Sequence, residues 1–513
     1  MEGFEGLAQL FPNLMLGFQT AVTVQNLGYC FAGVFLGTIV GVLPGIGPLA
    51  AIAMLLPATF NLPPVGALIM LAGIYYGTQY GGSTTAILVN LPGESASVVT
   101  CIDGYQMAKN GRAGPALAIA AVGSFFAGTV CTLIIAVAGP PLAEVALKFG
   151  APEYFSLMVM GLIASAVLAH GSLLKAIAMI FLGLIFGIVG TDVNSGMSRF
   201  TFGASGLADG LSFVVVAMGL FGFAEILSNL GKGKDAQHRE LLTKKIHGLM
   251  PTWHDIKISI GSIMRGTAIG AFFGTLPGAG PTISAFSSYA VEKKMAKDNS
   301  MFGKGAIQGV AGPESANNAA AQCAFIPTLT LGIPGSATMA LMLGALTIQG
   351  IAPGPQVMTQ RPDLFWGLIA SMWIGNAMLV ILNLPLIGLW VKLLQVPYRY
   401  LFPAIMVFMA IGVYSVNNLD MDIYLTVFFG LMGYVFVKLK CEPAPLILAF
   451  VLGPLMEENL RRALLISRGD PTVFLTRPIS AGFLIATALL LFFMILPAVR
   501  KKREEVLEED AAA

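Results

Sequence analysis

Residues Gly41–Pro48 read Gly-Val-Leu-Pro-Gly-Ile-Gly-Pro. The chain repeats this pattern 233 residues later (274 − 41), where Gly274–Pro281 read Gly-Thr-Leu-Pro-Gly-Ala-Gly-Pro. Each copy interrupts a strongly apolar segment with prolines and glycines, which break a helix and leave backbone amides without partners. In a hydrocarbon environment such a break persists only where protein or a wet cavity satisfies those amides. Paired breaks at matching places in two halves of a chain are typical of the binding sites of secondary transporters.

A second pair of breaks supports an internal repeat. Leu91–Ser95 (Leu-Pro-Gly-Glu-Ser) matches Ile333–Ala337 (Ile-Pro-Gly-Ser-Ala) at an offset of 242 residues (334 − 92). Two breaks per half at nearly the same offset favour a duplication over coincidence. Ahead of each first break, glycines recur every fourth residue, which predicts a smooth helix face that another helix can approach closely. These glycines are Gly33, Gly37 and Gly41 in one half and Gly266, Gly270 and Gly274 in the other.

The composition places the chain in a membrane. Of its 513 residues, 56% are hydrophobic and 11% are charged, whereas soluble proteins carry about 25% charged residues. Repeated apolar runs long enough to cross a bilayer predict an all-α polytopic membrane protein with about 10 to 14 hydrophobic segments. The expected crossing segments lie near 19–43, 65–90, 116–138, 153–169, 172–190, 206–230, 337–350, 364–389, 400–415, 422–437, 443–456 and 480–498.

The distribution of basic residues predicts how the halves lie in the membrane, because short cytoplasmic loops collect Lys and Arg. The linker before the second half contains six basic residues, whereas residues 1–108 contain none and open with no signal-peptide pattern. The loop after the second break reverses this bias, with Lys109 and Arg112 in the first half against Arg361 in the second. The two membrane repeats are therefore expected to be inverted, with broken or re-entrant helices. We expect repeats at 1–230 and 258–499, a basic cytoplasmic linker at 231–257 and a polar cytoplasmic tail at 500–513.

Glycines and small polar side chains surround the four predicted breaks. An in-plane two-fold axis would bring the breaks together near the bilayer midplane, where glycine amides and helix N-termini attract anions such as carboxylates. Singly, these glycines also suit close helix packing, and the hydroxyls suit bonds to helix carbonyls. Their paired arrangement favours an organic-anion site. The candidate substrate-binding residues are Gly45, Gly47, Ser83, Thr84, Thr85, Gly93, Ser95, Gly278, Gly280, Asn317, Asn318, Gly335 and Ser336.

Two carboxylates, Glu94 and Glu314, lie beside breaks in otherwise apolar surroundings. Intramembrane carboxylates are costly and mark ion or proton pathways. Each could bind a coupling proton, contribute to a sodium site or cap a half-helix, and we take both as candidate ion-coupling residues. Another charged group, Asp192, Arg199 and Asp209, favours a structural ion-pair network over substrate contact.

The motifs of several other function classes are missing from the sequence. It contains no GxxxxGK[ST], HExxH, GxSxG or paired-carboxylate catalytic motif, so the chain is not expected to be an ATP-driven motor or an enzyme. Its five cysteines lack CxxC spacing, so no metal, disulfide framework or cofactor is expected beyond a coupling Na⁺ or H⁺. No nucleic-acid partner is expected. An amide-lined organic-anion channel remains the alternative to a carrier, and an intramembrane enzyme is the least favoured interpretation.

At these motifs the chain resembles the large membrane subunit of the tripartite tricarboxylate transporters, the TctA family. The matching stretches are Leu43–Pro48, Tyr80–Leu88, Asp103–Ala108, Arg199–Gly203, Pro313–Ala319 and Leu329–Gly335. The resemblance implies a multi-pass symporter of the bacterial inner membrane that imports citrate-like di- or tricarboxylates, or related organic acids, on a proton or sodium gradient. It implies two protein partners, a small four-helix membrane subunit and a periplasmic substrate-binding protein. It assigns anion contact most readily to the glycines of the first breaks and to Asn317 and Asn318.

Overall fold

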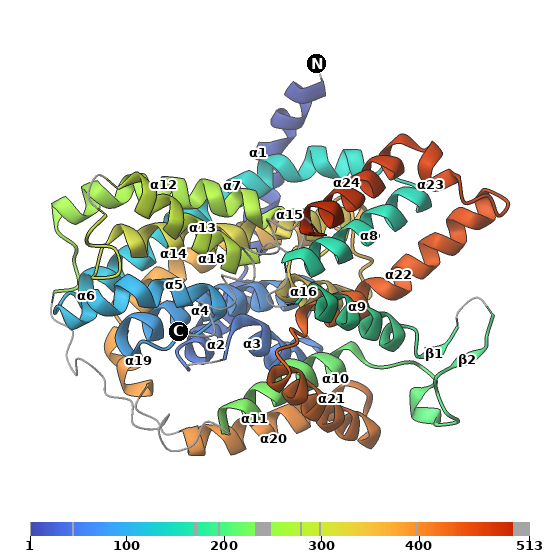
Figure 1. Ribbon diagram of the computed structural model, residues 1–513. Coiled ribbons are helices and arrows are strands. Elements are labelled where there is room, and N and C mark those ends of the chain that lie inside the picture. The colour runs from blue at the N-terminus through green and yellow to red at the C-terminus, as the bar shows by residue number, and fades with distance from the viewer. Residues whose placement is uncertain are drawn as a thin grey trace.

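The computed structural model describes residues 2–43, 46–168, 172–192, 195–230, 248–276, 280–296, 299–394 and 398–495. Over these residues the chain is almost entirely helical, and its strands are β1 (Gly190–Thr191) and β2 (Ser198–Arg199), which pair antiparallel (Figure 1). Five helices are long and apolar enough to cross a membrane, which confirms an all-α polytopic membrane protein. They are α2 (Val24–Gly41), α7 (Ala113–Ala146), α12 (Trp253–Gly274), α18 (Pro362–Asn383) and α21 (Asp420–Lys438).

The helices form two series along the chain: the first series is α1 to α11, and the second is α12 to α24. The first series contains α1 (Glu2–Ala21), α3 (Pro48–Leu55), α4 (Pro64–Val89), α5 (Val98–Thr100), α6 (Gln106–Lys109), α8 (Ala151–Leu168), α9 (Leu173–Gly187), α10 (Phe213–Ala217) and α11 (Ala224–Leu230). It also contains the 3₁₀ turns η1 (Leu56–Thr59), η2 (Ser95–Ser97) and η4 (Ser205–Leu207) and the π-helical segments η3 (Cys101–Tyr105) and η5 (Met218–Phe223). The second contains α13 (Gly280–Met295), α14 (Gln308–Cys323), α15 (Phe325–Leu331), α16 (Ala337–Ile348), α17 (Gln356–Gln360), α19 (Ile387–Leu393), α20 (Tyr398–Asn417), α22 (Ala444–Ile466), α23 (Val473–Thr476) and α24 (Pro478–Ile495).

Several helix boundaries differ from the expected segments. The segment expected near 19–43 is divided between α1 and α2, because the Thr23 hydroxyl accepts the Asn26 backbone N–H at 3.3 Å and so caps a new helix. The segment expected near 364–389 likewise ends as α18 and continues as the separate helix α19. Helix α7 is longer than expected and runs through two consecutive prolines, Pro140 and Pro141. Helix α12 begins at Trp253, capped by Thr252 and Asp255.

The regularly spaced glycines let two pairs of helices pack in backbone contact. A Cβ added to Gly33 of α2 would lie 2.2 Å from the Met70 carbonyl oxygen of α4. A Cβ added to Gly266 of α12 would lie 2.2 Å from the Gly312 carbonyl oxygen of α14. The two glycines that follow in each strip meet the same partner helix one turn further along at each step. The α2–α4 and α12–α14 hairpins are therefore built in the same way, and only glycine fits at these contacts.

Beyond these hairpins, the two series interlock. Helix α7 of the first series packs on α14 of the second, and α18 of the second packs on α4 of the first. Likewise, α9 of the first series packs on α22 of the second, and α21 of the second packs on the η5–α11 segment of the first. Neither series buries these surfaces by itself.

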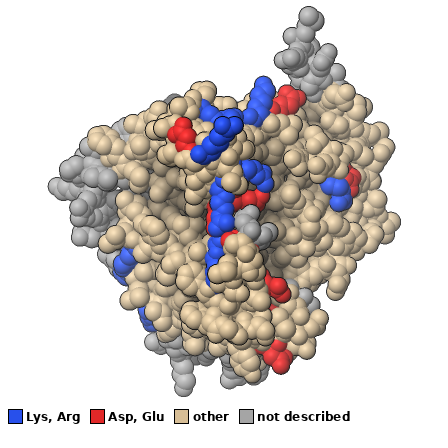
Figure 2. Space-filling view, turned by 90° about the vertical axis from the view of Figure 1, so that its right-hand side faces the viewer, with Lys and Arg blue, Asp and Glu red and all other residues tan. Residues whose placement is uncertain are grey.

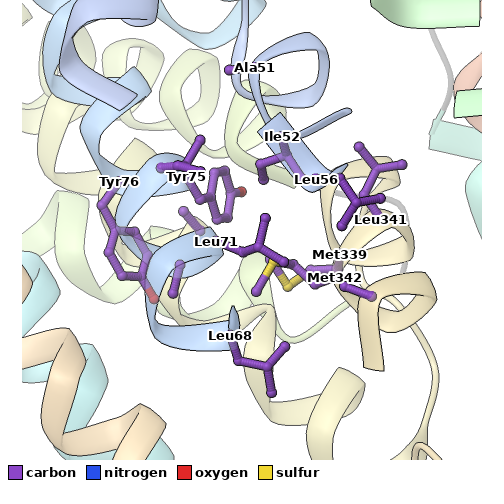
Figure 3. Close-up of a cluster of buried hydrophobic side chains, with 14 of the residues drawn as sticks. Ala51, Ile52, Leu56, Leu68, Leu71, Tyr75, Tyr76, Met339, Leu341 and Met342 are labelled. Carbon is purple, nitrogen blue, oxygen red and sulfur yellow. The ribbon is translucent and has the colours of Figure 1, made fainter. Parts of the chain in front are cut away.

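The segments that follow the breaks also pack across the series. Helix α3 follows the first break of the first series and packs on α16, which follows the second break of the second series. Their contact forms part of the apolar core, where α3, α4 and α16 meet (Figure 3). Conversely, α13 packs on η2, which follows the second break of the first series. The core between α3, α4 and α16 includes Ile52, Leu56, Leu71, Tyr75, Met339 and Met342 (Figure 3).

The β1–β2 hairpin projects from one end of the helical body (Figure 1). Arg199 of this hairpin is 2.7 Å from Asp192 and 2.9 Å from Glu457 of α22. Arg461, one turn further along α22, is also paired with Glu457. Seen from this end, charged side chains gather near the middle and broad flanks carry almost none (Figure 2). Uncharged flanks are what a lipid-facing surface requires.

Candidate functional site

The second break of the first series is a tight turn between α4 and η2. Helix α4 ends at Val89, and its C-cap residue Asn90 has a left-handed φ of 55°, which turns the chain out of the helix. Gly93 then lies against the backbone of α4 and of α2. A Cβ on this residue would be 2.3 Å from the Gly82 Cα and 3.0 Å from the Gly41 carbonyl oxygen. Only glycine fits here without movement of the backbone.

The second break of the second series repeats this geometry. Helix α15 ends at Leu331, and its C-cap residue Gly332 is also left-handed, with φ of 70°. Gly335 faces the Gly274 carbonyl oxygen, and its added Cβ would lie 3.3 Å away. Ser336 follows and accepts the Met339 backbone N–H on its hydroxyl at 3.2 Å, so it caps α16.

The first breaks lie close to the second ones where the structure describes them. Gly45 and Gly278, both candidate binding residues, lie outside the described residues. Gly47 begins α3 as its N-cap residue, and a Cβ on it would be 3.6 Å from the Cβ of Glu94. Gly280 is the first residue of α13, and in that helix the Thr282 hydroxyl oxygen is 2.9 Å from that of Ser95. The Ser95–Thr282 contact therefore joins a break of each series.

Glu314 is a buried carboxylate, with 1% of its surface exposed. It lies within α14 rather than beside a break, which corrects its expected position. Its Oε2 atom is 2.6 Å from the Ser83 hydroxyl of α4, and its Oε1 atom accepts a hydrogen bond from Thr100 of α5. Its side-chain partners are thus neutral hydroxyls, and no Lys or Arg of the described chain forms a salt bridge with it.

Glu94 has a different environment, at the start of η2. It forms a capping box with Ser97, so its capping role is present. Its Oε1 atom also accepts a hydrogen bond from the Asn317 side-chain amide at 2.7 Å. The side-chain oxygen of Asn317 (Oδ1) accepts in turn a hydrogen bond from Gln79 Nε2 at 3.3 Å. A chain of polar contacts therefore links the break to α14 and α4.

Several buried polar atoms next to this chain have no partner within the described residues. Both side-chain atoms of Asn318 and of Gln322 are unpaired, although both residues are fully buried. The side-chain oxygen of Gln79 (Oε1) and the hydroxyl of Tyr76, both on α4, are also unpaired. Because an unpaired buried polar group costs about 1–3 kcal/mol, a cluster of them points to a polar ligand or to water.

Two of the predicted hydroxyls have local partners instead. Thr84 donates to the Tyr80 carbonyl at 3.3 Å, and Thr85 donates to the Gly82 carbonyl at 2.8 Å, both within α4. These are the helix back-bonds that hydroxyl residues form inside apolar helices.

Sequence reasoning missed several polar residues of this region, chiefly Gln79, Thr100 and Gln322. A signal for two of them was present in the helical spacing. Gln79 lies four residues before Ser83, and Gln322 lies four residues after Asn318, so each pair shares one helix face. Thr100 carried no such signal, because it approaches Glu314 through a separate short helix.

The predicted charged group near residue 200 is an ion-pair network, as the contacts of Arg199 show. Its other members are Glu457 and Arg461 of α22, which the sequence did not indicate. Asp209 is exposed and lies outside the network.

Comparison with known proteins finds one matching family and two similar relatives. Residues 27–448 match the model of the family described as "Tripartite tricarboxylate transporter TctA family". An "Uncharacterized 52.8 kDa protein in TAR-I ttuC' 3'region" of Agrobacterium vitis is 58% identical over 504 residues, covering 98% of this chain and 100% of the relative. An "Uncharacterized protein in TAR-II ttuC' 3'region" of the same organism is 59% identical over 241 residues, covering 47% of this chain and 100% of the relative. No solved structure matches significantly.

Proposed function

Because this chain belongs to the TctA family of tripartite tricarboxylate transporters, we propose that it imports di- or tricarboxylates, or related organic acids, as a secondary transporter. It works in the bacterial inner membrane with a small four-helix membrane subunit and a periplasmic binding protein that delivers the substrate. A proton or sodium gradient drives uptake. The two series of helices act as inverted repeats in an alternating-access cycle.

The observation that carries this proposal is the cluster of unpaired buried amides beside the second breaks. Asn318 and Gln322 present two amide groups without partners, one turn apart on α14. Amide N–H groups bind carboxylates without fixing a full positive charge, which allows the substrate to be released again. The backbone amides of the glycine-rich breaks supply further donors, and we include Gly45, Gly47, Gly278 and Gly280 among them.

Ion coupling is assigned to Glu314. Its carboxylate is buried among neutral hydroxyls, and a buried charge of this kind must be neutralised by a bound cation or proton. Glu94 is assigned a positioning role, because it holds the Asn317 amide and caps η2.

The test is uptake of labelled citrate by proteoliposomes that contain this chain and its small partner, with the binding protein outside. Sodium and pH gradients are imposed separately. Accumulation that requires the binding protein and one gradient supports the carrier. Rapid equilibration that requires neither contradicts it and supports a channel. Other di- and tricarboxylates are then compared under the same gradients to establish the substrate range.

A further inference from the structure

A small cavity of about 20 Å³, enough for about one water molecule, lies on the side of α4 that faces α7 and the end of α18. Its apolar walls include Leu117 and Ala121 of α7. Its polar lining consists of Tyr80, Ser83, Thr84, Ser124 and Asn383. Ser83 thus faces this cavity and also contacts Glu314.

Asn383 has an unpaired oxygen in this lining. The residue is 5% exposed, and its amide nitrogen donates to the Leu379 carbonyl at 2.9 Å. Its Oδ1 atom has no partner among the described residues. A buried acceptor of this kind calls for a donor, and several polar groups around one cavity are what an ordered water needs.

Ser83 connects the cavity to Glu314 through a surplus of acceptors. Its hydroxyl oxygen is 2.6 Å from Glu314 Oε2 and 3.0 Å from the Gln79 carbonyl oxygen. A hydroxyl carries one proton and can donate to one of the two. Both contacts become hydrogen bonds when Glu314 carries a proton and donates it to Ser83, while Ser83 donates to Gln79. Thr100 supplies the bond to the other carboxyl oxygen.

Within the described part of the chain, the other ionisable groups near Glu314 supply no neighbouring positive charge. Those within electrostatic reach are Glu94, Tyr80 and Cys101. On α13, Glu292 packs against Gly312 and is already paired with Arg265 at 2.6 Å. Ser124 of α7 contributes a hydroxyl, 3.4 Å from the Glu314 backbone carbonyl. A proton therefore neutralises Glu314 with the groups at hand.

The position of the cavity gives it a direction. Helices α7 and α18 run antiparallel, since Trp373 of α18 bonds the Thr129 carbonyl while Asn383 and Leu117 line the same cavity. That end of α7 is held to the start of α12 by the Arg112–Asp255 salt bridge at 2.6 Å. The basic linker immediately precedes α12, so the cavity lies toward the side that we assign to the cytoplasm.

We propose that this cavity is the hydrated route by which the coupling proton leaves Glu314 for the cytoplasm. The Ser83 hydroxyl first turns from the Gln79 backbone carbonyl toward the cavity. Glu314 then gives its proton to the Ser83 oxygen while Ser83 passes its hydroxyl proton to a water there, so one proton enters and one leaves the serine. This inference rests on the proposed function and specifies its coupling ion and exit path.

The experiment places a single cysteine in the cavity wall by Ala121→Cys. Proteoliposomes containing this variant and its partner proteins are treated with a charged, membrane-impermeant thiol reagent on the linker side. We expect modification to reduce pH-gradient-driven citrate accumulation at least tenfold and to leave citrate–citrate exchange within twofold, because exchange needs no net proton release. The matched control is Val122→Cys, the next residue on α7, which is 45% exposed on the helix exterior. The parent chain controls for its native cysteines.

A second pair of variants tests the relay. Ser83→Ala should slow accumulation and shift its dependence on internal pH, and Ser83→Thr should restore both because it keeps the hydroxyl. Accumulation that follows a sodium gradient and ignores a pH gradient would overturn the proposal. Equal loss of exchange and accumulation after modification at residue 121 would overturn it as well. Exchange by the unmodified parent chain tests the proposed function separately.

Discussion

The second breaks of the two series share a backbone design but carry different side chains. Each follows a left-handed residue that ends a helix, Asn90 in one and Gly332 in the other. Each places a glycine against the backbone and a capping residue after it. The capping residue is Glu94 in the first series, where it also holds Asn317, and Ser336 in the second, where it caps α16. The shared backbone preserves the architecture, and the polar residues make the two sides chemically unequal.

The same inequality extends to the facing helices. At the 242-residue offset, Glu314 of α14 corresponds to Ala72 of α4, and Asn318 corresponds to Tyr76. The carboxylate therefore occurs on α14 only, and the Asn318 amide has a tyrosine as its counterpart on α4. Two hairpins with matching backbones thus carry different polar side chains.

The largest expected effect is a loss of stability when the glycine of each second break, Gly93 or Gly335, is replaced. Gly93→Ala should cost about 3 kcal/mol, because its Cβ would meet the Gly82 Cα at 2.3 Å and backbone cannot yield cheaply. Gly335→Ala should cost less than about 1 kcal/mol, because its closest contact would be 3.3 Å. Thermal unfolding of both variants in the same detergent measures the difference. Equal destabilisation would show that the two turns are equally tight.

The next effect concerns the unpaired amide. Asn318→Leu should lower citrate exchange about 100-fold, since a hydrogen bond to a carboxylate is worth about 2–3 kcal/mol. The folded protein should lose no stability, because the amide has no partner among the described residues to leave behind. The corresponding change in the first series, Tyr76→Phe, should lower exchange less than tenfold. A large loss of stability in Asn318→Leu would instead give this amide a structural role.

A smaller effect comes from making the two breaks alike. Glu94→Ser keeps a capping residue but removes a negative charge and frees the Asn317 amide. We expect the KM for the carboxylate to fall about fivefold, close to 1 kcal/mol, because one donor is released to the substrate. Ser336→Ala is the matched control and should change stability by about 1 kcal/mol with little effect on KM. A rise in KM for Glu94→Ser would contradict this account.

The smallest effect tests a region with no counterpart. The first series connects α9 to α10 through the β1–β2 hairpin, whereas the second connects α21 to α22 by a short turn. Glu457 lies beyond the crossing segment expected in α22, and its hydrogen bond with Arg199 lowers its pKa. The resulting stabilisation is present above the ordinary pKa of a glutamate and is lost as the pH falls through the lowered value.

Arg199→Ala should therefore cost less than about 1 kcal/mol at neutral pH. The difference in Tm between this variant and the parent chain should vanish in acid, below the lowered pKa of Glu457. A difference that persists there would mean that packing, rather than charge, holds the hairpin.

The sequence predicted the backbone of the site better than its contacts. The breaks, the glycine strips and most helices follow from local patterns, because proline, glycine and apolar periodicity act over a few residues. The split at Thr23 was missed, since a single capping hydroxyl divided an otherwise continuous apolar run. The Asn317–Glu94 bond could not be predicted, because it joins residues 223 apart through the packing of two series. The predictions for Gly45 and Gly278 stay predictions, since these residues lie outside the described part of the chain.

The exchange of helices between the series has a consequence for synthesis. When the first half has left the ribosome, α7 has not yet met α14, and the η5–α11 segment has not yet met α21. Those surfaces, including the one that carries Ser124, have no packing partner until the second half is inserted into the bilayer. The membrane insertion machinery must therefore hold an unfinished half-protein, and a ribosome that stalls in the linker would release a product with unfilled interfaces. Quality control by membrane proteases would act on that product rather than on the finished transporter.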